Sequence, residues 1–224
     1  MKTWAKTGAA VAVAALLTAC ATTTTPYDYT AFKASKPKSI LVLPPLNESP
    51  DVKATAGMLA SSTQPLAESG FYVFPVAAVA ETFLQNGLSQ PADIHQVGLD
   101  KLREIFGADA VLYITVKEYG TSYKVITSET TVRADARLVD ARTGTTIWSG
   151  EASASSAERN NDSHGLIGML LSAVLNQVIS TASDHSFNWA QIAGTRLLSA
   201  KQPHGVMYGP YSPHYESQPG KSAP

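Results

Sequence analysis

The chain has 224 residues, of which 44% are hydrophobic and 16% charged, and this balance predicts a globular fold with a hydrophobic core. Its 17 Lys and Arg oppose 18 Asp and Glu, and the loss of Lys2 and Lys6 with a cleaved leader would change the formal charge from −1 to −3. This charge excludes the basic footprint of a nucleic-acid-binding domain, so no nucleic-acid partner is expected.

The first segment has the pattern of a secretory signal. Two lysines precede an apolar run over residues 8–17, which is too short to span a bilayer as a permanent helix. The run ends in a stretch that resembles the lipobox of bacterial lipoproteins, formed by Leu17, Thr18, Ala19 and Cys20. We therefore interpret residues 1–19 as a lipoprotein signal peptide. The alternative is a chance cysteine beside an ordinary cleavage site.

Cys20 is the only cysteine, and the resemblance implies that its thiol and the new N-terminus are acylated. Each buried CH₂ contributes about 0.8 kcal/mol, so several chains anchor a protein durably without spanning the membrane. Ala21 occupies the position at which an aspartate retains proteobacterial lipoproteins in the inner membrane. We expect an outer-membrane lipoprotein on the periplasmic face, with surface exposure left open.

Residues 20–37 are interpreted as the lipidated N-terminus and a tether, because they begin with a polar threonine run. Tyr27, Tyr29 and Phe32 interrupt this pattern. They either pack back on the domain or lie near lipid headgroups.

The predicted periplasmic domain spans residues 38–200 and begins with a buried strand over 40–43, which proline ends. Asp51 could cap a helix that ends at Gly70 and that Pro65 should kink or restart. A second strand over 71–74 follows. Further helices are predicted at the segments 76–85 and 99–106, each of which is followed by a glycine.

The second half of the domain has strand patterns. Residues 111–116 form a strong apolar run, and residues 132–138 alternate apolar with charged side chains. A turn over 140–144 and a return strand over 145–149 predict an antiparallel hairpin, with Trp148 as a large cross-strand contact. This order of elements predicts an α/β domain of two or three layers. Its mixed sheet would combine an N-terminal strand–helix–strand unit with the antiparallel hairpin, and helices would follow at the C-terminal end.

Residues 164–182 form the most apolar segment of the mature chain and predict a helix. One interpretation is a core helix packed across the sheet. The other is a self-association face that would make a homodimer, because small residues allow close helix approach. The residues predicted to form that interface are Gly165, Gly168, Leu171 and Ser172. A last helix is predicted over 188–199, and residues 201–224 are predicted to be a disordered tail.

Three signatures resemble those of a family of proteobacterial outer-membrane lipoproteins of the neisserial surface-antigen candidate type. The first is PLAESGFYVFPV over 65–76; the second combines NGL, PADIH and LREIFGADAVLY between 86 and 113; the third combines RLVD, TG and WSG between 137 and 150. The resemblance covers residues 17–200. It implies a fold similar to the N-terminal domain of TolB and the periplasmic domain of the curli secretion lipoprotein CsgG, and it supplies no catalytic residues.

The sequence contains no G-x-S-x-G elbow, no H-E-x-x-H and no phosphate-binding glycine loop, so no cofactor or metal is expected. The groups Asp162-Ser163-His164 and Asp184-His185-Ser186 are interpreted as helix caps or links, and His95 as a surface or capping residue. We expect a non-enzymatic component that binds envelope proteins, a CsgG-like lipoprotein among the candidates, during assembly, secretion or transport. The alternatives are a ligand-binding lipoprotein of a transporter and a hydrolase with an unrecognised site.

Overall fold

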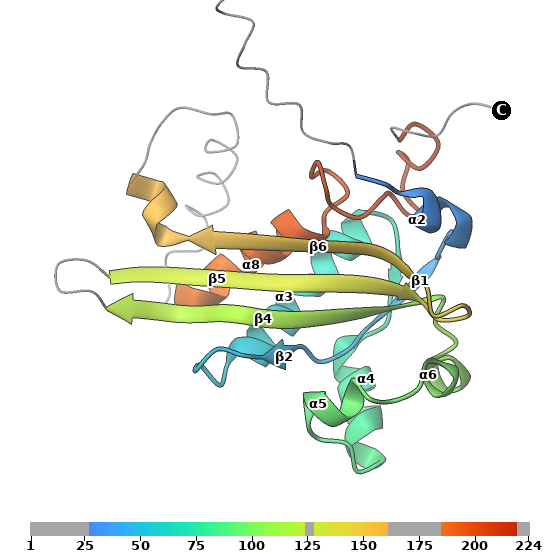
Figure 1. Ribbon diagram of the computed structural model, residues 1–224, viewed down its shortest axis with the longest axis horizontal. Helices are drawn as coiled ribbons and strands as arrows, with labels where there is room; N and C mark the ends of the chain where they lie inside the picture. The colour runs from blue at the N-terminus through green and yellow to red at the C-terminus, as the bar shows by residue number, and fades with distance from the viewer. Residues whose placement is uncertain (1–26, 124–127, 161–184, 219–224) are drawn as a thin grey trace, which may run out of the picture.

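The computed structural model describes residues 27–123, 128–160 and 185–218 (Figure 1). Its centre is a six-stranded mixed sheet in the order β3-β1-β4-β5-β6, with β2 also pairing with β4. The strands are β1 (Ser39–Val42), β2 (Leu46–Asn47), β3 (Tyr72–Val73), β4 (Ala110–Tyr123), β5 (Ser128–Asp140) and β6 (Thr146–Ser155). The pairs β1–β3, β1–β4 and β2–β4 are parallel, whereas β4, β5 and β6 are antiparallel. The predicted α/β class with a mixed sheet is confirmed.

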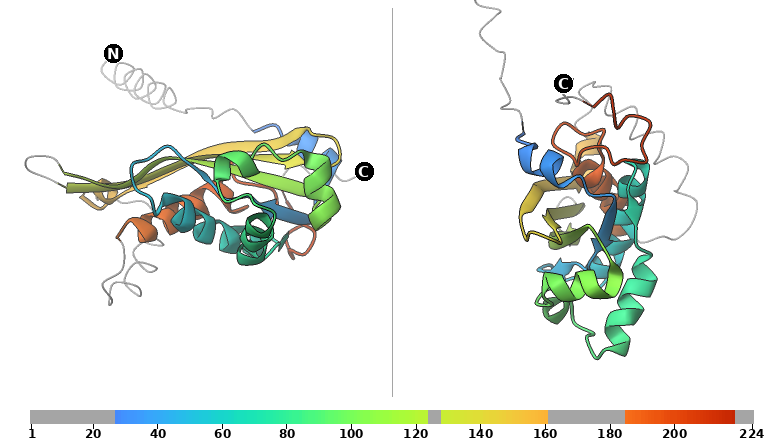
Figure 2. Two further views of the ribbon diagram at one scale, coloured as in Figure 1. Left: turned by 90° about the horizontal axis from the view of Figure 1, so that it is seen from below. Right: turned by 90° about the vertical axis from the view of Figure 1, so that its right-hand side faces the viewer.

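Helices cover the two faces of the sheet unequally (Figure 2). One face packs against α3 (Ala54–Glu68) and α8 (His185–Leu198), and this side forms the larger hydrophobic core. The other face packs against α4 (Val76–Gln85), α5 (Pro91–Ile94) and α6 (Leu99–Phe106) in a smaller core. The alternation along β1 separates them, since Ile40 and Val42 belong to the larger core and Leu41 and Leu43 to the smaller one.

Helix α3 continues through Pro65 to Glu68, so the proline starts no new helix. Proline has no N–H, and it therefore cannot donate to the carbonyl of Ser61 one turn earlier. Gly194 of α8 packs at this carbonyl, because a Cβ added there would lie 2.9 Å from the Ser61 oxygen. The close approach of the two helices therefore requires a glycine.

The predicted hairpin is confirmed and is longer than expected, because β5 and β6 pair from Thr131↔Ser155 to Val139↔Thr146. The apolar series of β5 faces the larger core through Val132, Ala134, Ala136 and Leu138. Trp148 lies opposite Leu138, is 1% exposed, and donates its Nε1–H to the carbonyl of His204 at 3.0 Å. The expectation that Trp148 is a packing residue is confirmed.

The prediction of a disordered tail over 201–224 is wrong for residues 201–218, which pack on the domain. Val206 and Met207 are buried in the larger core. The amides of Gly209 and Tyr211 donate to the carbonyls of Ser69 and Gly70 at 2.8 and 3.1 Å. Glycine here serves close backbone approach rather than disorder, because a Cβ at Gly209 would lie 2.3 Å from the Gly70 oxygen.

The tether predicted over 20–37 is also shorter than expected, because residues 27–37 belong to the folded domain. Residues Thr30–Ser35 form helix α2, which buries Phe32 against the ring of Phe71 at a centroid distance of 6.2 Å. Tyr29 donates its hydroxyl hydrogen to the carbonyl of Gly205 at 2.6 Å. The aromatic residues that interrupt the polar pattern therefore pack back on the domain. The N-terminal and C-terminal segments of the described chain are in direct contact.

Candidate functional site

Two groups of residues singled out in the sequence lie outside the described residues. They are the lipobox with its lipidation site (Leu17, Thr18, Ala19 and Cys20) and the predicted interaction helix (Gly165, Gly168, Leu171 and Ser172). Asp162, Ser163, His164 and Asp184 lie outside as well. The proposals for these residues therefore rest on sequence.

His95 lies at the C-terminal end of α5 and has structural partners. Its Nε2 is 2.9 Å from the carbonyl oxygen of Pro44, and its ring meets the ring of Tyr113 edge-on at 5.2 Å between centroids. Burial lowers the pKa of His95, the Pro44 carbonyl opposes this, and the charge of Arg137 adds to the lowering. Within residues 27–123, 128–160 and 185–218, no three His, Cys, Asp or Glu side chains are grouped as metal ligands.

The most distinctive surface is the side of the long strands that none of the described helices covers, here called the open sheet face. The smaller core reaches only Tyr113 on β4 and Val139 on β5. Beyond these residues, β4, β5 and β6 have described helices on one side only (Figure 2). The side chains on the open sheet face include Lys117, Glu118, Arg133, Asp135, Arg137, Ser149, Glu151 and Ser153.

Charges on the open sheet face are arranged in pairs across the strands. Arg133 lies 2.7 Å from Glu118, and Lys117 lies 2.9 Å from Glu48 and 3.8 Å from Asp135. These side chains are about one-third to one-half exposed, and such exposed pairs contribute about 0–1 kcal/mol each to stability. The face is therefore polar and ordered, and the fold depends little on it.

Arg137 marks the boundary between the covered and uncovered parts of the sheet. Its guanidinium lies 4.0 Å from the centroid of the Tyr113 ring, in cation–π geometry. Tyr113 in turn contacts His95, and burial raises the pKa of the Tyr113 phenol. No ion pair is found for Arg137 in the part of the chain that the structure describes.

The most strongly held carboxylate, Asp140, is 2% exposed and ends β5. Burial would raise its pKa, but hydrogen bonds from the Ser35 hydroxyl, the Arg142 guanidinium, and the amides of Arg142 and Thr143 lower it to about 2. Arg142 also donates to the carbonyl of Ser35 at 2.9 Å. Asp140 thereby fastens α2 to the hairpin turn, which is a structural role.

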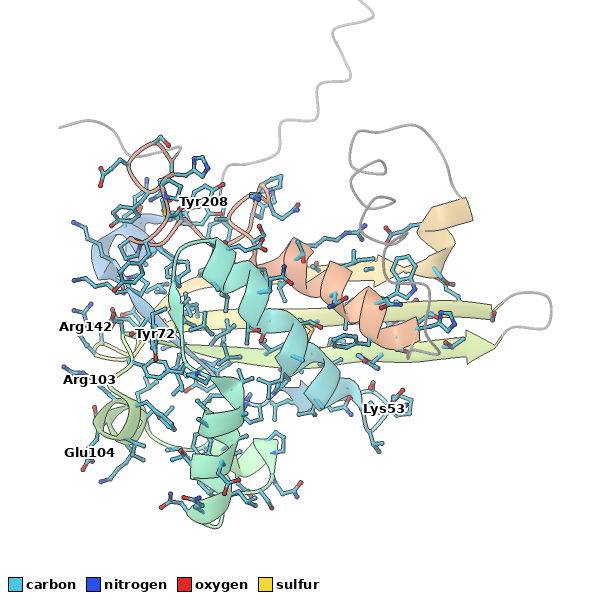
Figure 3. The ribbon with its side chains drawn as sticks, turned by 180° about the vertical axis from the view of Figure 1, so that it is seen from behind. Lys53, Tyr72, Arg103, Glu104, Arg142 and Tyr208 are labelled. Atoms are coloured by element: carbon cyan, nitrogen blue, oxygen red, sulfur yellow. The ribbon has the colours of Figure 1, made fainter. Side chains whose placement is uncertain are left out.

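A depression of about 650 Å³ lies beside this turn and is lined by Asp100, Arg103, Glu104, Gly107, Ala108, Asp109 and Arg142. Figure 3 shows Arg103, Glu104 and Arg142 at the same end of the molecule. The depression is open, and charged side chains line it. Small-molecule sites are usually enclosed and mostly apolar, so this surface lacks the features expected of one.

Sequence reasoning found part of the open sheet face, through the alternation of Arg133, Asp135 and Arg137. It missed Glu151 and Ser153, because the predicted return strand ended at residue 149 and the residues after it are small and polar. Their alternation with Gly150, Ala152 and Ala154 is the signal that would have extended the strand. None of the helices in the described ranges is long and apolar enough to cross a membrane.

A mixed-sheet α/β domain behind a lipobox-like leader is the organisation of a lipid-anchored protein of the bacterial envelope. The chain belongs to the family described as "Putative lipoprotein GNA1162-like", whose model matches residues 27–211. The match includes part of the packed C-terminal segment. The family assignment made from the three signatures is confirmed, while the likeness to TolB and CsgG stays a prediction.

Two proteins to which the chain is similar come from Neisseria meningitidis. The protein named "Putative lipoprotein NMB1124/NMB1162" of Neisseria meningitidis serogroup B is 55% identical over 195 residues, which are 87% of this chain and 90% of that protein. The crystal structure of lipoprotein GNA1162 from Neisseria meningitidis gives a TM-score of 0.53 at 61% identity, over 65% of this chain and all of that one. The LpoB C-terminal domain from Escherichia coli is 22% identical with a TM-score of 0.37, over 53% of this chain and 84% of that one, which carries no argument about function.

Proposed function

We propose that this lipoprotein is a non-enzymatic interaction component of the envelope, anchored through Cys20 in the outer membrane and facing the periplasm. The family, the lipobox-like leader and Ala21 after the cysteine support the anchor and its location. The role is to bind another envelope protein during assembly, secretion or transport. A CsgG-like lipoprotein is one candidate partner.

The open sheet face is the single observation that carries this proposal. A half-sheet of three long strands has one side packed by helices and the other lined with paired charges and small polar residues. Arg137 and Glu151 point from it without an ion-pair partner among the described residues. Polar surfaces of this kind suit non-obligate protein partners, whose interfaces are about as polar as the rest of a protein surface.

Site-specific crosslinking in intact cells tests the role of the open sheet face. A photoreactive residue at Glu151 or Ser153 is expected to trap a partner of defined mass, which mass spectrometry identifies. The matched control is Gln64, which is exposed on α3 on the helix-covered side of the sheet. Adducts of the same mass and yield from Gln64, or none from Glu151 and Ser153, would contradict a specific interface on this face.

The anchor is tested separately by Cys20→Ser. The variant is expected to lose metabolic fatty-acid labelling and to accumulate as an uncleaved precursor, because the thiol that receives the lipid is absent. Retained labelling would show that the lipid is attached elsewhere.

Self-association through residues 164–182 stays a second part of the proposal. Glycine on a helix is less favourable than alanine by about 1 kcal/mol, so Gly165 and Gly168 suggest a neighbour at close range. Sedimentation of the soluble domain should show a dimer that Gly168→Leu converts to a folded monomer, while Leu171→Glu tests the apolar stripe. A wild-type monomer at every concentration would leave this helix with a core role alone.

A further inference from the structure

The two ends of the described chain meet on one side of the molecule (Figure 1). We call the surface made by residues 27–38 and 201–218 the terminal face. Tyr29 bonds to Gly205, and the buried Phe32 shares the larger core with Val206 and Met207. The position at which the tether enters the domain is thus fixed by the C-terminal segment, and both present their exposed side chains together.

The terminal face differs in composition from the rest of the chain. Five of the nine tyrosines lie in its two segments, namely Tyr27, Tyr29, Tyr208, Tyr211 and Tyr215, and among these five only Tyr211 has an exposed side chain. It contains four lysines and two acids, a net charge of +2, whereas residues 39–200 contain ten Lys and Arg against 16 Asp and Glu, a net charge of −6. Lys33, Lys36 and Lys38 are exposed, and Tyr211 is 67% exposed. The basic surface that presents Tyr211 is therefore local to this side.

The chain between the anchor and the domain is short. Seven residue steps separate Cys20 from Tyr27, and a fully extended chain spans at most about 3.6 Å per residue. The first described residue of the domain, Tyr27, therefore lies within about 25 Å of the lipidated Cys20. A surface that surrounds the entry point must lie close to the membrane that holds the lipid.

We propose that the terminal face rests on the headgroups of the membrane that carries the anchor, so that the domain is held in one orientation on anionic lipid. This inference rests on the proposed anchor at Cys20. Lysines are attracted to anionic lipid, and tyrosine, with its apolar ring and polar hydroxyl, concentrates at membrane–water interfaces. The expected ligand is the lipid headgroup rather than free phosphate, because the anchor at Cys20 holds the terminal face close to the membrane.

The orientation has a functional consequence. Helices α4 and α6 lie on the side of the molecule opposite to α2 and the C-terminal segment (Figures 1 and 2). With the terminal face on the membrane, this opposite side points into the aqueous space. The open sheet face then stands between the two, reachable by a partner that is itself close to the membrane.

The test uses the full acylated chain in vesicles, with one fluorophore at an introduced cysteine. The native thiol is occupied by lipid, so Pro213→Cys on the terminal face and Leu84→Cys on α4 can be labelled singly; both positions are exposed. A quencher attached to lipid headgroups should suppress the label at residue 213 more than the label at residue 84. The difference should increase when phosphatidylglycerol is added to phosphatidylcholine vesicles.

Charge reversal separates lipid contact from simple tethering. Replacing Lys33, Lys36 and Lys38 with Glu should reduce the phosphatidylglycerol-dependent quenching at residue 213 at least about fivefold, because one basic residue near an anionic surface contributes about that factor. Lys53→Glu, which lies well away from Tyr208 (Figure 3), is the control and should leave this quenching unchanged. Circular dichroism should show that the reversed variant remains folded.

The outcomes distinguish the two proposals. Equal quenching at residues 213 and 84, or quenching at residue 213 that ignores both phosphatidylglycerol and the charge reversal, overturns the oriented contact while the anchor stands. A wild-type chain that fails to remain on vesicles of any composition overturns the anchor and this inference with it.

Discussion

The long strands β4, β5 and β6 pass through two different environments. At the end near the β5–β6 turn, both faces are buried, and β5 accordingly finishes with three consecutive buried positions, Leu138, Val139 and Asp140. At the other end only one face is buried. There Val132 and Ala134 of β5 are buried in the core, whereas Arg133 between them is exposed. One strand therefore changes from alternating burial to continuous burial where the second helical layer begins.

This difference predicts that the doubly covered end of the strands governs stability and that the open sheet face governs binding. We call the end of the strands at the β5–β6 turn the near end and the opposite end the far end. Burial of apolar area contributes about 25 cal/mol per Å² to stability, so the near end, with two buried faces, stabilises the fold more per residue than the far end. The open sheet face can vary its charges at little cost to the fold. Substitutions that test the near end should therefore change stability strongly, and those on the open sheet face should change binding.

Trp148→Ala is expected to have the largest effect. The side chain fills the core beside Leu138 and bonds to the carbonyl of His204, so its truncation should lower the free energy of unfolding by about 3–5 kcal/mol. Urea unfolding followed by circular dichroism measures this. Trp148→Phe keeps most of the volume and should recover more than half of the loss. Native stability in Trp148→Ala would show that the near end does not depend on this contact.

Asp140→Asn should destabilise the near end by about 2 kcal/mol at pH 7, because a pKa lowered from 3.8 to about 2 corresponds to that free energy. The depressed pKa means that the stabilisation is fully present above about pH 4 and is lost as the pH falls through about 2. Unfolding curves of wild type and variant should therefore differ at pH 7 and converge on acidification. A gap that stays constant down to pH 2 would show that the carboxylate charge is not the cause.

Tyr29→Phe removes the hydroxyl that donates to Gly205 and should cost about 1 kcal/mol. The ring remains, so Phe32 and the larger core should keep their packing. Limited proteolysis should show faster cleavage near residues 203–205 in the variant, since the contact joins the two terminal segments. Unchanged stability and cleavage would indicate that Val206 and Met207 hold the segment by themselves.

The packing of this C-terminal segment is also what the sequence could least predict. Local patterns predicted the helices 76–85 and 99–106 with the bounds that the structure has, because proline, glycine and amphipathic spacing are local signals. Proline, glycine, serine and tyrosine over 201–218 indicate disorder locally, yet Gly209 and Tyr211 bond to Ser69 and Gly70, about 140 residues earlier. Such contacts depend on the folded partner. The charged residues of β5 on the open sheet face were predicted, because alternation along a strand is a local signal. That no described helix covers them could not be predicted, because helix packing depends on the whole fold.

Arg133→Ala on the open sheet face should have the smallest effect on stability. Its ion pair with Glu118 spans 2.7 Å, but both side chains are about half exposed, so solvent screens the attraction and the expected loss is about 0.5 kcal/mol or less. A double-mutant cycle with Glu118→Ala should give a coupling free energy of the same size that decreases in high salt. In cells, the same substitution should reduce crosslinking from Glu151 if a partner binds this face. A loss of stability above about 2 kcal/mol would show that the far end is as tightly built as the near end, and that its uncovered side is needed by the fold itself.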